Sequence, residues 1–290
     1  MVLFIIKFIL QYRKYLRSII EIIYKLPTLK KPLPNNPFGK SIIASKDKYI
    51  NLHKLALRQN DQKVIIFEKN CGYSINRKWF NDLALHTQVV IKKEEINFFH
   101  GRLLYSLLSK YINDKKLEET ELDQLSIFET GTARGFSSIC MAKALNDNNF
   151  PGSITTLDCI PHQKKIYWNC IDDHDGPKSR QELLMKWENE LKKIIFIQGW
   201  TDEILASLGM LRINFAFLDA QHTKEDVLKE FKFVSKRQLN GDIVVFDDVT
   251  YDSFPGVCEA IDFIQKNYDY KIEKIKFTEK RGYAIATKLS

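Results

Sequence analysis

The sequence predicts an α/β protein with a doubly wound, mostly parallel sheet of seven strands whose last strand is antiparallel, and with an N-terminal helical extension. Three features predict this fold. From about Leu125 onward, short apolar runs alternate with stretches of helical length, which is typical of a parallel sheet with helices on both faces. A turn that contains two glycines follows the first run. The final two runs have no helix between them.

Each expected strand is a short run of mainly apolar or β-branched residues. Helical stretches separate the first six runs, and the four residues from Thr278 to Arg281 join the last two, a length that suits a hairpin. The expected strands are Ser126–Glu129, Ile154–Leu157, Ile194–Ile197, Ile213–Leu218, Ile243–Phe246, Tyr270–Phe277 and Gly282–Thr287. The expected helices are Phe136–Leu145, Gln163–Cys170, Asp202–Leu208, Glu225–Val234 and Val257–Gln265.

The middle of the chain carries weaker signals. Lys63–Phe67 is a short run of β type, and Glu94–Ile112 has apolar positions at helical spacing. We therefore expect a helical, partly irregular cap over residues 37–120, which leads into the main domain at residues 121–290.

Residues 1–26 are expected to form a basic amphipathic helix, and a proline-rich linker follows it up to residue 36. Its polar residues recur at spacings of three and four, which places them on one face. Two interpretations stay open: the helix lies on an anionic membrane surface, or it docks on the body of the protein or on a second subunit of a homodimer. The polar positions are Lys7, Gln11, Lys14, Ser18, Glu21 and Lys25.

This segment is not expected to span a membrane, because Lys7 interrupts it before it reaches the ~20 apolar residues that a spanning helix needs. A secretory signal is not indicated, since a basic n-region and a small-residue cleavage site are missing. The five cysteines form no C-x-x-C pair, so zinc and redox motifs are unsupported. We expect a cytoplasmic protein, with the inner face of the membrane as its one alternative site.

The net charge of +8 belongs almost entirely to the N-terminal arm. Residues 1–40 carry +7, which leaves +1 for the rest of the chain. A nearly neutral body does not indicate a surface that binds nucleic acid, so no nucleic-acid partner is expected.

The turn ETGTARGFS, from Glu129 to Ser137, ends the first strand and opens the first helix. Gly131 and Gly135 let the backbone approach a ligand, and the helix N-terminus favours negative charge. The full dinucleotide fingerprint G-x-G-x-x-G is absent. Taken alone, the turn is a weak signal, because a simple tight connection between strand and helix would have the same form.

Two further strand ends carry candidate cofactor contacts. Asp158 ends the second strand, where a carboxylate can accept hydrogen bonds from both hydroxyls of a ribose. Gly199 and Trp200 follow the third strand and would line an adenine, although Trp200 suits a core position equally well.

Three acids, Asp219, Asp247 and Asp248, follow the fourth and fifth strands. The carboxyl ends of parallel strands meet in one crevice, so these side chains are expected to converge and to repel each other unless something neutralises them. A hard divalent cation such as Mg²⁺ would do so. The alternative is that one acid caps a helix and the others are solvated. His222, three residues after Asp219, would act as a general base.

Together these residues resemble the class I methyltransferases that use S-adenosylmethionine (SAM). The resemblance covers about residues 125–288. It is closest to the metal-dependent O-methyltransferase branch, with its catechol, caffeoyl-CoA and macrocin-type enzymes. It rests on the motifs FETGTARGFSS, TLD, FLDAQHTKEDV, GDIVVFDDV, PGVCEAID and RGYAIA.

The resemblance implies a Rossmann-like fold and a specific set of site residues. Asp219, Asp247 and Asp248 would bind Mg²⁺ or another hard divalent cation, and His222 would stand where catechol-type enzymes have a lysine base, with Asp219 as a second proton acceptor. The implied SAM-binding residues are Glu129, Gly131, Thr132, Gly135, Ser137, Asp158, Gly199, Trp200 and Asp219.

The implied reaction is methyl transfer to a hydroxyl of a sugar, a glycan or a secondary metabolite, so the expected partner is a small-molecule or glycan acceptor. Two departures stand out. Asp248 replaces the asparagine of catechol enzymes, and the long stretch Asp172–Glu190 is interpreted as a lid or a substrate element.

Three other functions compete with this one. A non-catalytic SAM-binding scaffold would have no need of the three acids and His222. An enzyme that uses NAD is disfavoured by the missing third glycine and by the closing strand pair. A metal-dependent hydroxylase on a methyltransferase-like sheet is the third.

Overall fold

The computed structural model describes residues 31–118 and 123–290, so the predictions for residues 1–26 lie outside the described residues. The chain divides into one unit at Met1–Leu33 and a second at Pro34–Ser290, and the second unit carries the whole sheet. The boundaries expected at residues 36 and 120 stay predictions.

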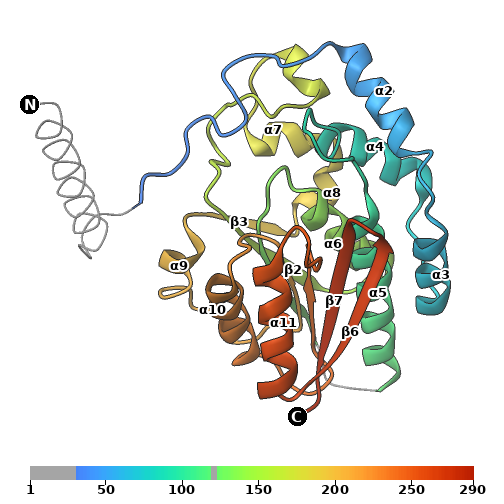
Figure 1. The fold of residues 1–290 in the computed structure, drawn as a ribbon, viewed down its shortest axis with the longest axis vertical. Helices are drawn as coiled ribbons and strands as arrows, with labels where there is room; N and C mark the ends of the chain where they lie inside the picture. The colour runs from blue at the N-terminus through green and yellow to red at the C-terminus, as the bar shows by residue number, and fades with distance from the viewer. Residues whose placement is uncertain (1–30, 119–122) are drawn as a thin grey trace, which may run out of the picture. The chain divides into compact units, whose positions relative to one another are not determined.

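The sheet has seven strands in the order β3-β2-β1-β4-β5-β7-β6, which confirms the predicted fold class (Figure 1). Strands β1 to β5 pair in parallel, whereas β7 runs antiparallel to both β5 and β6. The strands are β1 (Leu125–Thr130), β2 (Gly152–Asp158), β3 (Ile194–Gln198), β4 (Phe215–Leu218), β5 (Ile243–Phe246), β6 (Tyr270–Thr278) and β7 (Arg281–Lys288).

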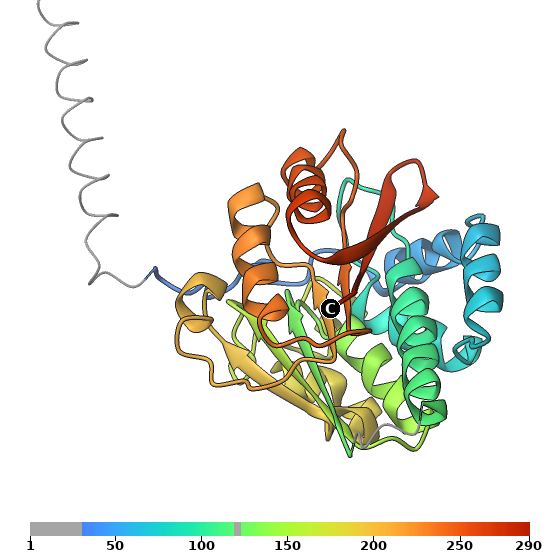
Figure 2. The ribbon, with the colours of Figure 1, turned by 90° about the horizontal axis from the view of Figure 1, so that it is seen from below.

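Helices cover both faces of the sheet (Figure 2). Alternate residues of a strand point to opposite faces, so Ile127 packs with the core beneath α5 (Phe99–Leu117) and α6 (Phe136–Asp147), while Phe128 packs with the core beneath α10 (Lys224–Ser235) and α11 (Pro255–Asn267). The ends of β1, β2, β4 and β5 thus share one edge between two helical layers.

The region before β1 is helical. It contains α2 (Lys46–Ala56), α3 (Gln62–Cys71) and α4 (Arg77–Thr87), and then α5, which confirms the helix expected at Glu94–Ile112 but begins five residues later.

The strand predicted at Lys63–Phe67 is wrong, because this run lies inside α3. Val64 and Glu68, four residues apart, are the buried side chains of α3, and the Glu68 carboxylate binds the buried Arg102 of α5 at 2.7 Å. Packing against α5 therefore overrides the local β preference of the run.

The helix predicted at Gln163–Cys170 is also wrong. The segment is not helical, and it forms an isolated antiparallel bridge between Ile166 and Lys178. Ile166, Trp168 and Cys170 are buried, a spacing of two that suits an extended chain.

Short helical pieces follow this segment: η1 (Ile171–Asp175), α7 (Arg180–Leu184), η2 (Met185–Trp187) and α8 (Glu188–Leu191). The helix expected at Asp202–Leu208 shrinks to the four residues of α9 (Thr201–Ile204).

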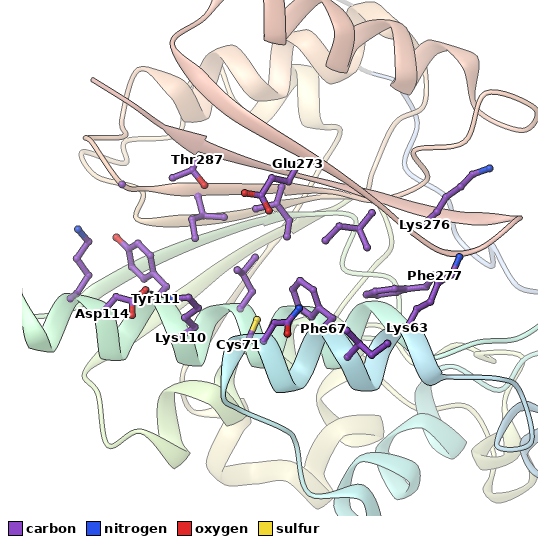
Figure 3. A pocket seen from close by; sticks show the side chains of 18 of the residues that line it. Lys63, Phe67, Cys71, Lys110, Tyr111, Asp114, Glu273, Lys276, Phe277 and Thr287 are labelled. Carbon is purple, nitrogen blue, oxygen red and sulfur yellow. Dashed lines mark hydrogen bonds and ion pairs between the residues drawn. The ribbon is translucent and has the colours of Figure 1, made fainter.

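A pocket of about 670 Å³ lies between helices α3 and α5 and the β6–β7 ribbon (Figure 3). Phe67 and Phe277 contribute to its apolar floor, and Lys63 and Lys276 are exposed beside it. It includes none of the predicted site residues.

Within the part of the chain that the structure describes, no helix is both long enough and apolar enough to cross a bilayer.

Glu230 of α10 is a buried carboxyl group that the sequence analysis did not single out. Its Oε2 accepts a hydrogen bond from Thr130 Oγ1 at 2.7 Å, and its Oε1 has no hydrogen-bond partner among the described residues. Burial raises the pKa of Glu230 from 4.5 to about 8.

Since folded Glu230 holds its proton up to about pH 8, we expect it to make the protein less stable as the pH rises from about 4.5 to 8. Glu230→Gln is uncharged at every pH, so it should unfold at a higher temperature than the wild type at pH 8.5 and at a similar temperature at pH 5. Thermal melts at both pH values test this. Glu225→Gln, at an exposed position of the same helix, is the control, and an equal shift in both variants would contradict the expectation.

Candidate functional site

The turn after β1 adopts backbone conformations that require glycine. Gly131 and Gly135 both have φ +86°, in the left-handed region. A Cβ on Gly131 would collide with the carbonyl oxygen of Asp219, because the turns after β1 and β4 touch here; on Gly135 it would lie 2.6 Å from Leu184 Cδ1. Gly135 caps α6, so the turn leads into a helix N-terminus as predicted.

Glu129 stands behind this turn and is fully buried. Its Oε2 accepts hydrogen bonds from Ser138 and, at 2.5 Å, from Thr156 Oγ1, and its Oε1 has no partner among the described residues. Burial raises the pKa of Glu129. A buried carboxylate oxygen without a donor is chemically suited to an ammonium group.

Asp158, at the end of β2, is held by backbone donors. Its Oδ2 accepts from the Ala133 amide at 2.6 Å and its Oδ1 from the Ile160 amide at 2.7 Å. Each carboxylate oxygen has a second lone pair, so both can still accept a hydroxyl proton.

A pocket of about 260 Å³ opens beside Asp158 at the carboxyl ends of the strands. Five predicted cofactor residues line it: Gly131, Asp158, Gly199, Trp200 and Asp219. Four others do not. Glu129, Thr132, Gly135 and Ser137 stand behind or beside it, where Thr132 shares a 2.5 Å hydrogen bond with Thr156.

The three acids after β4 and β5 lie near enough to repel one another, although Asp247, an expected metal ligand, is outside the cluster of possible ligands described below. Asp247 and Asp248 are buried, Asp219 is half-buried, and burial and mutual repulsion raise the pKa of Asp219 well above its usual range. The same causes raise the pKa of Asp247 to about 7. Asp248 has φ +58°, an uncommon conformation for a residue other than glycine.

His222 reaches this group from the turn after β4. Its Nε2 lies 3.0 Å from Asp248 Oδ2, and its ring stacks on Phe254 with centroids 4.5 Å apart. Ligand atoms of Asp219, His222 and Asp248 all lie within 4.8 Å of one another. Asp247 is not part of this cluster, and its Oδ1 accepts a hydrogen bond from the Asp248 amide at 2.7 Å.

Arg281 is a site residue that the sequence analysis missed. It opens β7, beside the end of β5, and its Nη1 donates to Asp248 Oδ1 at 2.8 Å. The neighbouring carboxylates raise the pKa of Arg281 against the effect of its own burial. The signal was present in the motif RGYAIA, whose first residue it is. The cluster of carboxylates therefore already has one positively charged side chain of the protein beside it, that of Arg281.

A second pocket, of about 580 Å³, adjoins Arg281. Amides, hydroxyls, charged groups and two aromatic rings line it, and Phe254 joins it to the ring of His222. The lining residues are Gln59, Asn60, Lys93, Glu94, Glu95, Asn97, Phe99, Ser253, Phe254, Thr278, Lys280 and Arg281.

Gly131→Ala tests the close approach of the turns after β1 and β4. We expect loss of cofactor binding and lower stability, because the new methyl group would meet the carbonyl oxygen of Asp219. The control is Gly72→Ala, which places alanine at φ +80° with nothing within 4 Å of the new Cβ. Both variants carry the backbone strain of about 1 kcal/mol. Calorimetry and thermal melts test this, and equal effects in the two variants would assign the loss to strain alone.

Comparison with known proteins bears on this site. Residues 128–249 match a family model described as a methyltransferase domain, and this range runs from the middle of β1 to just after β5, with the turns that carry the acids. A search of curated proteins finds no match.

Solved structures resemble this chain at low sequence identity. The O-methyltransferase TomG of Streptomyces achromogenes, which takes part in tomaymycin synthesis and was solved with SAM, is 18% identical; the match covers 75% of this chain and 92% of TomG, with a TM-score of 0.50. An O-methyltransferase of Bacillus cereus, solved with S-adenosylhomocysteine, is 13% identical, with 84% of this chain and 100% of that chain covered and a TM-score of 0.47.

The family match covers the turns that form the pocket, and β7, the last strand along the chain, is antiparallel to its neighbours as the resemblance implied. Residues 128–249 therefore match a methyltransferase domain, and the chain has the Rossmann-like fold of the methyltransferase TomG.

Proposed function

We propose that this enzyme transfers the SAM methyl group to a hydroxyl oxygen, with help from a divalent cation held by Asp219, His222 and Asp248. The proposal rests mainly on Asp219, which takes part in two sites. It lines the pocket beside Asp158, and it belongs to the cluster whose ligand atoms lie within 4.8 Å of one another. A cation in that cluster would be next to the cofactor.

The cofactor assignment follows the shape and chemistry of the pocket. The ribose hydroxyls would donate to Asp158, and the adenine would lie between Gly199–Trp200 and Ile160. The ammonium group of the methionine part would suit the unpartnered Oε1 of Glu129. Gly131 leaves room for the chain of the cofactor to pass.

The donor set fits a divalent cation. Two carboxylates supply the oxygen ligands that Mg²⁺ prefers, and the imidazole adds a nitrogen ligand that Mn²⁺ and other transition metals accept more readily. A bound cation lowers the pKa of a hydroxyl group that it binds. Asp247 would help to position Asp248, because its carboxylate accepts a hydrogen bond from the backbone amide of Asp248.

The reaction breaks the bond between sulfur and the methyl carbon and forms a bond between that carbon and the acceptor oxygen. S-adenosylhomocysteine leaves, and the hydroxyl proton passes to a protein group. Asp219 has a carboxylate with two oxygens, so one can face the cation while the other accepts the proton. His222 is the alternative acceptor when its Nε2 is not a ligand.

The pocket beside Arg281 is the proposed site of the acceptor. Amides and carboxylates suit an acceptor with several hydroxyls, and the faces of Phe99 and Phe254 suit the apolar face of a sugar ring. We therefore propose that the acceptor is a hydroxyl of a sugar, a glycan or a glycosylated secondary metabolite.

For residues 1–26, contact with an anionic membrane and contact with a second copy of the chain both remain proposals.

The test is methyl transfer from SAM labelled in the methyl group to a panel of monosaccharides, nucleotide sugars and phenols, with Mg²⁺ or Mn²⁺ present. We expect label in an ether linkage of at least one polyhydroxy acceptor. Transfer only to nitrogen or carbon acceptors would contradict the proposal.

A further inference from the structure

Arg180 is a buried charged residue in the segment that the sequence analysis interpreted as a lid or a substrate element. It is the first residue of α7, and it is 1% exposed. The helix starts at a capping box in which Ser179 and Glu182 bind each other's backbone amides, so the position of Arg180 is well defined.

The guanidinium of Arg180 contacts the turn after β1 and the end of β2. Its Nε donates to the Ala133 carbonyl at 2.9 Å, and its Nη2 lies 3.6 Å from Asp158 Oδ2. The rings of Trp168 and Phe196 flank the group at 5.6 and 5.5 Å. A buried arginine with these neighbours has few other positions available.

Ala133 links Asp158 and Arg180 through hydrogen bonds of its backbone. Its amide donates to Asp158, and its carbonyl accepts from Arg180. Its φ of +45° is unfavourable for alanine, so contacts on both sides of the residue must hold it. Ala133 and Asp158 both line the pocket of about 260 Å³.

We infer that Arg180 is a positioning residue for the cofactor: it holds Asp158 and the turn after β1 in the arrangement that binds the adenosine part of SAM. The inference rests on the proposed cofactor role of Asp158. The stretch Asp172–Glu190 then supports the cofactor pocket through its buried residues. Arginine suits this role because one planar group donates in several fixed directions, which the single ammonium of lysine cannot reproduce.

The experiment compares Arg180→Lys with the wild-type chain by calorimetry. We expect the dissociation constants of SAM and of S-adenosylhomocysteine to rise by the same factor, about tenfold or more, since both carry the adenosine part. At saturating SAM, kcat should change much less than KM for SAM. A purely structural role would lower the melting temperature without this selective rise.

Arg102→Lys is the matched control. Arg102 is also a buried arginine, 3% exposed, and its partners Glu68 and Asp61 lie outside the pocket. This variant should lose stability and keep its affinity for SAM. If Arg180→Lys binds SAM as tightly as Arg102→Lys does, the positioning role is wrong.

Asp158→Asn separates this inference from the proposed function. If Asp158→Asn leaves SAM affinity unchanged, the proposed cofactor placement itself fails. If Asp158→Asn weakens SAM binding but Arg180→Lys does not, only the role of Arg180 fails. The double variant should bind SAM about as weakly as the weaker single variant, because both residues act in one network.

Discussion

Asp248→Asn is expected to lower the rate of methyl transfer by about 10²–10³-fold and to leave SAM affinity within a factor of a few. Asp248 is the residue on which the proposed catalytic groups meet, since Oδ2 lies 3.0 Å from His222 and Oδ1 2.8 Å from Arg281. It does not line the pocket assigned to the cofactor. Asparagine at position 248 carries no negative charge, so it would bind the cation and Arg281 more weakly than aspartate does.

Asparagine is the right replacement because it changes little else. It has nearly the same shape as aspartate, and it tolerates the left-handed φ of +58° that most other residues would not. A loss of activity will therefore reflect the missing charge.

Single-turnover rates and calorimetry with SAM test this expectation. Asp252→Asn, at a nearby exposed position outside the cluster, should keep the wild-type rate. A wild-type rate in Asp248→Asn would refute the catalytic role of the cluster, and a parallel loss of SAM affinity would place Asp248 in the cofactor site.

Removal of divalent cations is expected to have a comparably large effect. With a chelator, transfer should fall by about 10²-fold or more, and Mg²⁺ or Mn²⁺ should restore it. The reason is electrostatic: burial and the neighbouring carboxylates hold the pKa of Asp219 and Asp247 above the usual range, so a cation that binds there relieves repulsion.

The same binding should stabilise the fold. A ligand that binds only the folded state at about 100 times its dissociation constant stabilises it by about 2.7 kcal/mol, which a thermal melt detects. Both effects should be absent from Asp248→Asn.

Arg281 offers an alternative to the cation as the source of positive charge. Its guanidinium already neutralises part of the negative charge of the neighbouring carboxylates. If the cation is required, Arg281→Gln should bind it more tightly, since one competitor for Asp248 is gone. Full activity in the chelator, together with inactivity of Arg281→Gln, would show that the arginine alone balances the acids and that the metal proposal is wrong.

The fold was predictable where local patterns and packing agree. The strand Ile243–Phe246 is observed with the predicted bounds, because four apolar residues buried on both faces leave no other option. Predictions failed where packing with distant residues decided. Lys63–Phe67 is helical because of its contacts with α5, and Gln163–Cys170 is extended because alternate side chains are buried.

The site was predictable in its list of residues and less so in its arrangement. Asp158, Asp219 and the two aspartates after β5 stand at strand ends, where the parallel sheet brings them together. Their pairings were not predictable. His222 contacts Asp248, Asp247 binds the next amide, and Arg281 enters from β7, across an antiparallel pairing of distant segments.

By itself, the sequence determined the order of the strands in the second half of the chain, the glycines of the turn after β1, and the acids at the strand ends. These depend on local periodicity and on backbone conformation, which neighbouring residues encode. Only the tertiary structure decided which charges are neighbours, and that Arg180 and Arg281 stand among them. The energy of a buried charge depends on distances of a few ångströms between residues far apart in the chain, and no local pattern specifies those distances.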